Sequence, residues 1–504
     1  MARSTIRFLR RSRVVEVGGF SSRTTLLDWL REQNRSVGTK EGCAEGDCGA
    51  CTVVLGRVRE GRLVYEPVNA CILLLGQIDG AELITVEDLA QRGELHPVQA
   101  SMVAHHGSQC GYCTPGIVMS LFSLYHEGAR PVTREGVCDA LAGNLCRCTG
   151  YRPIIDAALE ACGQEADDVF SQRRQATVQA LADLASEEDL FVGDDRSFFA
   201  APASEDALAS LLSEHPEATL LAGGTDVGLW LTKALAPLRK FIWLGRVRGL
   251  DEIHDTPEVL GLGAMVSHAR ALPSLAAIDP DLGELMRRFG AQQVRASGTV
   301  GGNIANGSPI GDLAPALIVM GAILELRQGP NRRTLALENF FVAYRRQDKR
   351  HAEYLRSILV PKPGPADHVR IFKVTKRFDE DISAVMMAMR LTIQDGRIVG
   401  ARIAFGGMAA TPKRANAVEH ALLDSQIGEG SVWAVAAEAL ARDFTPVDDH
   451  RASAAYRLQV AKNLVVKALA EIAGAPTSAT RIIGHRTVPP QETSGPVAQP
   501  EFAP

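Results

Sequence analysis

The chain has 504 residues, of which 46% are hydrophobic and 22% charged, and its formal net charge is −5. This length predicts about three or four domains, and the composition is that of an ordinary soluble protein with ample core. The slightly acidic balance gives no sign of a nucleic-acid or membrane-surface partner. No apolar run approaches the length of a membrane span, and the amino-terminal residues lack the apolar run of a signal peptide.

The first part of the chain predicts a small sheet with one helix. The expected elements are strands at 6–9 and 14–17, an amphipathic helix at 26–32, strands at 52–58 and 63–68, and a short apolar helix that begins at Cys71. Thr24 or Thr25 supplies the cap of the first helix. A cysteine-containing loop lies between the helix and the second pair of strands, which is an order typical of β-grasp ferredoxins.

Eight of the ten cysteines fall into two groups of four. The first group has the spacing Cys-x4-Cys-x2-Cys with a distant fourth cysteine, which is the plant-type [2Fe–2S] spacing. Its members are Cys43, Cys48, Cys51 and Cys71. The loop is rich in glycine and alanine, whose small side chains let backbone N–H groups point at the inorganic sulfurs. The sequence therefore predicts an iron–sulfur cluster here.

The second group lies in a segment that is predicted to be almost wholly helical. Helices are expected at 97–106, 114–127, 133–143 and from 153 onward. The cysteines of this group are Cys110, Cys113, Cys146 and Cys148. They fall on loops at the ends of helices, and two such loops can meet at one end of an antiparallel helix set. A second cluster is the resulting prediction.

Disulfides, structural zinc and unliganded thiols are the alternatives to iron–sulfur clusters. Ten cysteines in 504 residues are too sparse for a disulfide-stapled secreted domain. Structural zinc favours paired Cys-x2–4-Cys knuckles, which the second group resembles in its first half, and buried unliganded cysteines would not cluster in this way. Cys138 and Cys162 fall outside both groups and are expected to be ordinary packed thiols. Thiolate ligands and free thiols fit a reducing compartment, so we expect the cytoplasm.

Two glycine-rich stretches follow a polar segment that is expected to be a partly helical linker. They lie at 220–227 and 299–312. Their consecutive glycines allow close backbone approach, and their N–H groups can cradle a diphosphate. Neither is the Gly-x-Gly-x-x-Gly fingerprint, so a Rossmann site is not supported. Either stretch alone is compatible with an ordinary turn, but the pair, together with Asn303 and Asp312, favours a phosphate-bearing cofactor.

The carboxyl-terminal part predicts another α+β unit. Strands are expected at 386–393 and 398–406, and helices at 432–441 and 456–473. From about residue 476 the chain is rich in Pro, Ser and Thr, and we expect it to be disordered. His268 is expected to be a packed or surface residue rather than a ligand.

Three cysteine motifs resemble the paired iron–sulfur signatures of the molybdenum hydroxylases. They are Gly42-Cys-Ala-Glu-Gly-Asp-Cys-Gly-Ala-Cys-Thr52, Gln109-Cys-Gly-Tyr-Cys-Thr-Pro-Gly116 and Gly143-Asn-Leu-Cys-Arg-Cys-Thr-Gly-Tyr-Arg-Pro153. The two glycine-rich stretches are similar to the FAD loops of that family, and residues 295–309 and 373–383 extend the match. The similarity covers roughly residues 3–470.

The resemblance implies a multidomain α+β fold. A β-grasp [2Fe–2S] ferredoxin domain at 1–85 precedes an all-α, four-helix [2Fe–2S] domain at 86–163 and a linker at 164–190. A two-part α+β FAD-binding domain of the vanillyl-alcohol-oxidase type at 191–370, an α+β flavoprotein domain at 371–475 and the tail at 476–504 complete the chain.

The resemblance also assigns cofactors and site residues. It places two [2Fe–2S] clusters on the eight grouped cysteines and implies FAD, with NAD+ as the electron acceptor. No catalytic residue is assigned to this chain. Lys373 is expected to reach the isoalloxazine edge, and Gln109 to lie beside the cluster that receives electrons first. The implied FAD contacts are Leu220, Leu221, Ala222, Gly223, Gly224, Thr225, Asp226, Val227, Phe289, Thr299, Asn303, Asp312, Leu355 and Lys373.

Iron–sulfur and then flavin parts on one chain, with no molybdenum part after them, are similar to the small subunit of bacterial two-subunit xanthine dehydrogenases. This implies a large partner subunit that holds the molybdenum cofactor and an assembly of two small and two large subunits. Electrons would pass from molybdenum through the second and first cysteine groups to FAD and NAD+, as hypoxanthine or xanthine becomes urate. The alternatives are the equivalent subunit of another molybdenum hydroxylase, acting on an aldehyde or another N-heterocycle, and a non-enzymatic iron–sulfur scaffold or redox sensor.

Overall fold

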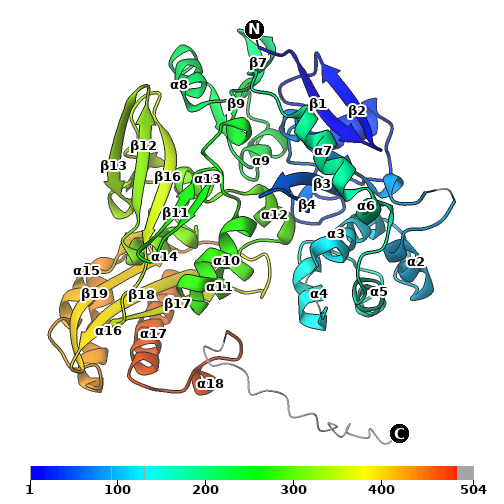
Figure 1. Cartoon of the computed structure of the whole chain (residues 1–504). Helices are drawn as coiled ribbons and strands as arrows, with labels where there is room; N and C mark the ends of the chain where they lie inside the picture. Colours follow the sequence, from blue (N-terminus) through cyan, green and yellow to red (C-terminus); the bar gives the residue numbers. More distant parts are fainter. Residues whose placement is uncertain (1, 92, 129–130, 485–504) are drawn as a thin grey trace, which may run out of the picture.

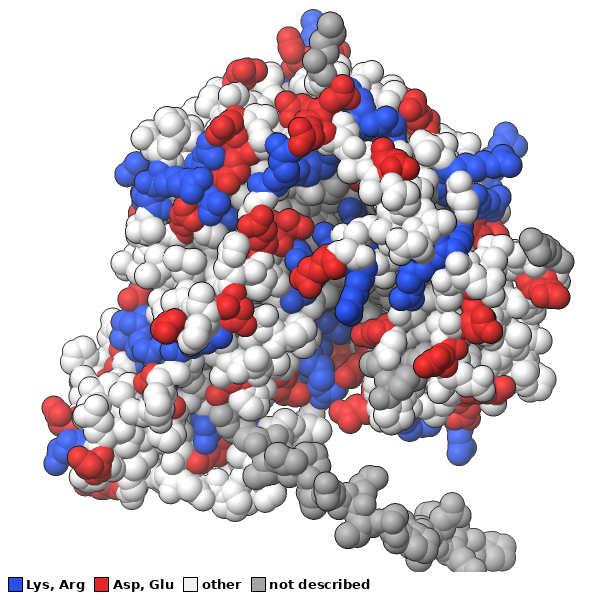
Figure 2. Space-filling model, in the orientation of Figure 1, with Lys and Arg blue, Asp and Glu red and all other residues white. Residues whose placement is uncertain are grey.

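The computed structural model describes residues 2–91, 93–128 and 131–484. Successive units follow one another from the blue strands at the amino terminus, through cyan helices and a green central part, to a yellow and orange unit (Figure 1). Sheets and helices mix in all of them except the cyan one, so the predicted multidomain α+β fold is confirmed. Basic and acidic side chains are interspersed over the face shown in Figure 2. No helix within the described ranges is long and apolar enough to cross a membrane.

The amino-terminal unit is a five-stranded sheet of order β2-β1-β5-β3-β4. Its strands are β1 (Thr5–Arg10), β2 (Arg13–Gly18), β3 (Thr52–Arg59), β4 (Arg62–Asn69) and β5 (Glu82–Ile84). The strands β1 and β5 run parallel, whereas the other neighbours are antiparallel. Both predicted hairpins are confirmed.

One helix of this unit follows the prediction and one does not. The expected helix at 26–32 is α1 (Leu26–Asp28), capped by Thr25 and continued by the π-helix η1 (Trp29–Gln33). The helix expected from Cys71 is wrong, because the helical turn η2 (Leu75–Ile78) begins later. Residues 71–72 form a turn instead, and the following residues pair with the start of α1, where Leu26 N–H donates to the Leu73 carbonyl and Leu75 N–H to the Thr24 carbonyl.

The second unit is all-helical, as predicted. Its helices are α2 (Pro97–Ala104), α3 (Thr114–Glu127), α4 (Arg134–Leu141) and α5 (Arg152–Cys162). The helix α3 begins after Cys113 and ends at Gly128, whose positive φ of 77° suits glycine. Cys162 is buried in α5 as expected. The prediction that Cys138 is packed is wrong, because this thiol is exposed. The helix α4 buries its other face, which carries Val137 and Leu141.

The predicted linker is more helical and better packed than its polar composition indicates. It forms α6 (Val169–Gln172) and α7 (Arg174–Leu184). The helix α7 buries Leu181 and Leu184 and lies against β1, β3 and β4. This segment therefore covers the ferredoxin sheet rather than spanning a gap.

The flavin unit contains two large sheets and, in addition, a small hairpin of β14 (Phe341–Ala343) and β15 (Arg346–Gln347). The first has the order β6-β7-β9-β8 and the second β10-β11-β16-β12-β13. The first sheet and its helices are β6 (Leu190–Asp194), β7 (Ser197–Ala201), α8 (Glu205–Glu214), β8 (Thr219–Leu221), α9 (Val227–Thr232) and β9 (Lys240–Trp243). The second sheet comprises β10 (Ile253–Asp255), β11 (Val259–Gly263), β12 (Ile323–Gln328), β13 (Asn331–Ala336) and β16 (Tyr354–Pro361). Between β11 and β12 the chain forms α10 (His268–Ile278), α11 (Pro280–Arg287), α12 (Gln292–Ser297), α13 (Val300–Asn306) and α14 (Leu313–Met320).

The last unit has a sheet of order β17-β18-β19-β20 with helices. Its elements are β17 (Asp367–Val374), β18 (Val385–Gln394), β19 (Arg397–Gly406), β20 (Lys413–Arg414), α15 (Asn416–Leu422), α16 (Gly430–Asp443) and α17 (Ala454–Ile472). The two predicted strands and two predicted helices are confirmed. The wholly buried helix α14 of the flavin unit packs against β18 and β19, so these units share one core.

The tail prediction needs a correction for its first residues. The chain forms α18 (Thr477–Thr480) and then places Arg481 between two buried carboxylates, 2.7 Å from Asp281 and 2.6 Å from Glu471. Ion pairs thus hold this segment against the fold, although it has little hydrophobic content to bury. The rest of the predicted disordered tail, 485–504, lies outside the described residues.

Candidate functional site: two cysteine groups and a flavin-sized cavity

The structure brings the first four cysteines together on one loop and the turn after β4. The Cys43 thiol hydrogen-bonds with the thiols of Cys48 and Cys71, and Cys71 does so with Cys51. The backbone N–H groups of Glu45 and Cys48 also point at the Cys43 sulfur, each at 3.4 Å. Four converging sulfurs with N–H donors around them form a donor set that fits a [2Fe–2S] cluster.

The loop that leads into α3 and the loop before α5 bring the second group together. The Cys113 thiol hydrogen-bonds with Cys146, and Cys110 does so with Cys148. Cys146 is buried, whereas Cys110 and Cys148 are exposed. Gln109 is exposed next to Cys110. The second group therefore has an open face at the surface, whereas Cys51 and Cys71 of the first group are buried.

Both glycine-rich stretches line one cavity of about 640 Å³, within the range of about 300–1,000 Å³ that is typical of ligand sites. Thirteen of the fourteen predicted FAD contacts line it. The exception is Leu221, which is fully buried in the apolar core shared with the ferredoxin sheet. It lies on β8, where neighbouring side chains point to opposite faces, so Leu220 faces the cavity and Leu221 the core.

The cavity also fits a cofactor that brings its own polar groups. The Asn303 Oδ1 and His268 Nδ1 atoms are buried in its wall without a hydrogen-bond partner in the described part of the chain. Gly223 lines the cavity, and a side chain there would overlap the Ser297 carbonyl, so this glycine lets the first glycine-rich stretch pack closely against the end of α12. Lys373 and Asp312 form a buried ion pair at 2.6 Å, and Ser383 donates to the same carboxylate.

His268 is packed, as predicted, but it also lines the cavity. Its ring lies on Phe289, with centroids 4.4 Å apart. Burial, helped by the charge of Arg295, lowers the pKa of His268 to about 3, so the ring is neutral at physiological pH. Glu380 is a further lining residue that the sequence did not indicate, and burial together with Asp47 raises its pKa to about 8.

The cavity adjoins the first cysteine group. Glu45 of the cysteine loop and Ile72, which follows Cys71, are part of its lining. Thr232 of α9 donates to the Ala44 carbonyl at 2.7 Å, and Gln77 donates to the Ala222 carbonyl at 3.1 Å. A cluster on this loop and a flavin in this cavity would therefore be neighbours.

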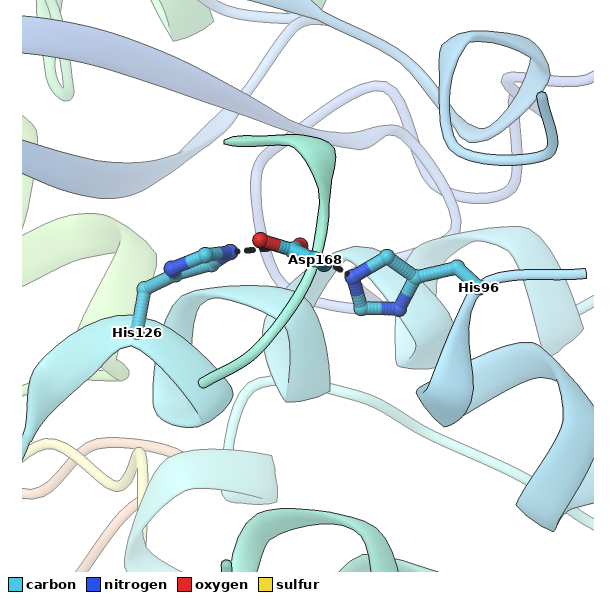
Figure 3. A group of neighbouring side chains, drawn as sticks. All are labelled: His96, His126 and Asp168. Atoms are coloured by element: carbon cyan, nitrogen blue, oxygen red, sulfur yellow. Dashed lines mark hydrogen bonds and ion pairs between the residues drawn. The ribbon is translucent and has the colours of Figure 1, made fainter. Parts of the chain in front are cut away.

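A separate buried group, His96, Asp168 and His126, has the residue types of a metal site. Both rings point at the carboxylate (Figure 3), with Nε2–Oδ2 distances of 2.7 Å for His96 and 3.0 Å for His126. However, the Nδ1 atom of His96 accepts the N–H of Val98, so its Nε2 carries the proton and donates to Asp168. The contacts are hydrogen bonds that hold α2, α3 and the start of α6 together, and this protonation excludes His96 as a metal ligand.

This group predicts acid sensitivity. Burial opposes ionisation of Asp168, but the hydrogen bonds from His126 and His96 outweigh it and hold the Asp168 pKa well below its usual range. Burial lowers the pKa of His126 despite its bond to Asp168. The unfolded chain therefore takes up a proton on His126 below about pH 6.5 and on Asp168 below about pH 4, so both groups reduce the free energy of unfolding as the pH falls.

A His126→Gln variant tests this, because glutamine can still donate to Asp168 but does not titrate. We expect its melting temperature to fall less than that of the wild type between pH 7 and 5, since each pKa unit of the His126 shift is worth about 1.4 kcal/mol. His254→Gln, at a histidine whose side chain is 73% exposed, is the matched control and should follow the wild type. Parallel melting curves for all three proteins would contradict the prediction.

Four family models match the chain in order. They are the 2Fe-2S iron-sulfur cluster binding domain at 16–75, the [2Fe-2S] binding domain at 85–159, the FAD binding domain in molybdopterin dehydrogenase at 195–363 and the CO dehydrogenase flavoprotein C-terminal domain at 370–472. The matches support two [2Fe–2S] clusters and FAD as cofactors.

Curated relatives match most of the chain. A xanthine dehydrogenase of Drosophila pseudoobscura pseudoobscura is 32% identical over 94% of this chain and 39% of its own length. The xanthine dehydrogenase/oxidase of Rattus norvegicus is 32% identical over 80% of this chain and 34% of its own. The chain thus spans less than half the length of the relatives it matches.

Solved structures match a part of the chain. One is quinoline 2-oxidoreductase from Pseudomonas putida 86, with 28% identity, a TM-score of 0.50, and coverage of 54% of this chain and 95% of the other. Another is carbon monoxide dehydrogenase from Hydrogenophaga pseudoflava, with 28% identity, a TM-score of 0.51 and the same coverages. The order of the four domains and these relatives fit an iron–sulfur and FAD subunit of the molybdenum hydroxylase family.

Proposed function

We propose that the chain is the electron-transfer and NAD+-reducing subunit of a xanthine dehydrogenase. It would pass electrons from a molybdenum centre on a large partner subunit through two [2Fe–2S] clusters to FAD and NAD+, while hypoxanthine or xanthine is oxidised to urate. Bound flavin would supply the conversion between one-electron and two-electron transfer. The chain itself supplies thiolates at the two cysteine groups and a cavity whose lining is mainly apolar, with polar side chains such as Asn303, Asp312 and Lys373.

The observation that carries the proposal is the placement of the two cysteine groups. The first group adjoins the cavity through Glu45 and Ile72, which favours delivery of electrons to a flavin there. The second group has Cys110 and Cys148 at the surface, which favours docking of a partner that supplies electrons. Such a chain would transfer electrons from its surface to its cavity.

Xanthine as the substrate is favoured by the relatives, since the xanthine dehydrogenases match 80–94% of the chain. We infer an assembly of two small and two large subunits by analogy with that family. The cytoplasm suits thiolate ligands, because its redox poise keeps thiols reduced.

A second candidate is the same role in another molybdenum hydroxylase. The favouring observation is the structural match to an oxidoreductase of quinoline, an N-heterocycle, and to a carbon monoxide dehydrogenase. In both, a nearly whole chain matches only about half of this one, so this chain carries parts that the matched chain lacks. That difference favours xanthine. A non-enzymatic iron–sulfur scaffold would not account for the cavity that the glycine-rich stretches line.

The test is cofactor analysis of the chain purified from its native source. We expect about four irons and one FAD per chain, two distinguishable [2Fe–2S] signals in low-temperature EPR, and a larger molybdenum-containing partner. Xanthine, hypoxanthine, quinoline and an aldehyde are then offered in turn, with NAD+ reduction as the readout. Zinc in place of iron, or absence of flavin, would refute the proposal, and NAD+ reduction with quinoline but not xanthine would select the second candidate.

A further inference from the structure

A buried polar network lies where the two iron–sulfur units meet the flavin unit. Its centre is the side-chain amide of Gln293, on helix α12, which packs beside β4 (Figure 1). The Gln293 Nε2 atom lies 3.2 Å from the Thr52 Oγ1, 3.1 Å from the Ser120 Oγ and 3.0 Å from the Asn144 Oδ1. All four side chains are at most 2% exposed. One residue of the flavin unit thus contacts the start of β3, helix α3 and the loop before Cys146.

Asn144 extends the network to the first cysteine loop. Its amide donates to the Gly49 carbonyl at 3.2 Å, and its carbonyl accepts from Ser120 at 2.6 Å. Beside it, the Leu145 N–H donates to the Cys48 carbonyl at 3.0 Å. The second cysteine loop therefore hydrogen-bonds directly to a residue that carries a sulfur of the first.

Glycines make this contact close. A side chain at Gly49 would overlap the Gly143 carbonyl, and one at Gly143 would overlap the Gln293 amide. Gly49 also has a positive φ of 69°, which glycine adopts without strain. The backbones of the two cysteine loops are therefore in direct contact, and the Gln293 side chain packs against Gly143 at this contact.

The network is polar where an apolar contact would have sufficed for stability. Burying an amide and two hydroxyls is costly unless their hydrogen bonds are made. Here the Gln293 Nε2 atom and both hydroxyls have partners, whereas the Gln293 Oε1 atom has none among the described residues. The hydrogen bonds that are made favour one arrangement of the groups that they join. Hydrogen bonds and packing around cluster loops also set reduction potentials. These features fix the position of both loops relative to the flavin unit.

We propose that Gln293 is a positioning residue for electron transfer, which holds the two cysteine loops at a fixed separation and orientation through Asn144, Ser120 and Thr52. The inference rests on the proposed function, because it presumes a cluster on each loop. It adds that the flavin unit itself sets how the two clusters are coupled.

The test is a Gln293→Leu variant of the full chain. Leucine is apolar and similar in size to glutamine. Without the Gln293 amide, Thr52 still donates to the Gly49 carbonyl and Ser120 still donates to Asn144. We therefore expect a folded protein with wild-type iron and flavin content. We expect redox-titrated EPR to show a shifted midpoint potential for at least one cluster, and a loss of magnetic interaction between the two reduced clusters. Gln292→Leu is the matched control, because Gln292 is the neighbouring residue of α12 and its amide makes none of the hydrogen bonds of the network. Its spectra should equal those of the wild type.

Unchanged potentials and unchanged magnetic interaction in Gln293→Leu would overturn the proposal, even if its melting temperature fell, because a purely structural contact would affect stability alone. If Gln293→Leu loses a cluster during purification, Ser120→Ala decides the matter: a smaller shift of the same sign supports the positioning role, and wild-type spectra refute it. A wild-type chain without two clusters would instead be a failure of the proposed function, which the same iron analysis reveals separately.

Discussion

A Cys113→Ser variant is expected to lose flavin reduction by the oxidisable substrate while retaining flavin reduction by NADH. Cys113 lies at the start of α3, where its thiol hydrogen-bonds with Cys146 and is close to Cys110. Serine keeps the shape but not the thiolate that iron requires. Loss of contacts around a metal site costs about 10–100-fold in affinity or activity, so loss of a ligand should cost more than about 100-fold. Under the proposed function, NADH would reduce the flavin directly, without the second cluster.

The measurement is anaerobic bleaching of the flavin band of the complex, first with substrate and then with NADH. Cys138→Ser is the matched control, because Cys138 is exposed on α4 and belongs to neither group; both reductants should bleach it at the wild-type rate. Equal survival of both reactions in Cys113→Ser would show that electrons do not pass through the second group.

The cysteine groups could be predicted because their information is local. Three of the first four ligands lie within nine residues, and the second group is bracketed by helix starts such as Thr114-Pro115. Thirteen of the fourteen predicted FAD contacts line the cavity, ten of them in the two glycine-rich stretches. Leu221 faces the core instead, and a family segment does not reveal which residues of a strand face the core. The cysteine spacing and the nearby helix ends are local properties, and which side chains close the cavity is not.

The remaining differences arise from long-range contacts. Gln293 has no signature in its own helix, since its three partners come from β3, α3 and the loop after α4. The linker became a docked helix because a few leucines of α7 meet the ferredoxin sheet. Residues 477–484 are held in place by Arg481, whose partners Asp281 and Glu471 belong to other elements of the fold. Composition alone does not encode such pairings.

An Asp312→Ala variant is expected to purify with little flavin and to melt at a lower temperature. The Asp312 carboxylate pairs with Lys373 at 2.6 Å, and both side chains are 5% exposed. Removing one partner leaves a buried ammonium without its counter-charge, at a cost of about 3–5 kcal/mol. Both residues line the cavity, so we also expect the proposed flavin contacts to be lost. The measurements are the ratio of flavin to protein absorbance and thermal melting of the flavin-free protein.

The double variant Asp312→Asn, Lys373→Met separates these two effects. It removes both charges while keeping similar side-chain sizes. Replacing a whole buried ion pair is often neutral for stability. Asparagine also keeps an acceptor for the Ser383 hydroxyl, which donates to Asp312 in the wild type. We therefore expect the melting temperature of the flavin-free double variant to approach that of the wild type while its flavin content stays low. Recovery of flavin together with stability would mean that the pair serves folding alone, and that the flavin is held by the glycine-rich stretches without it.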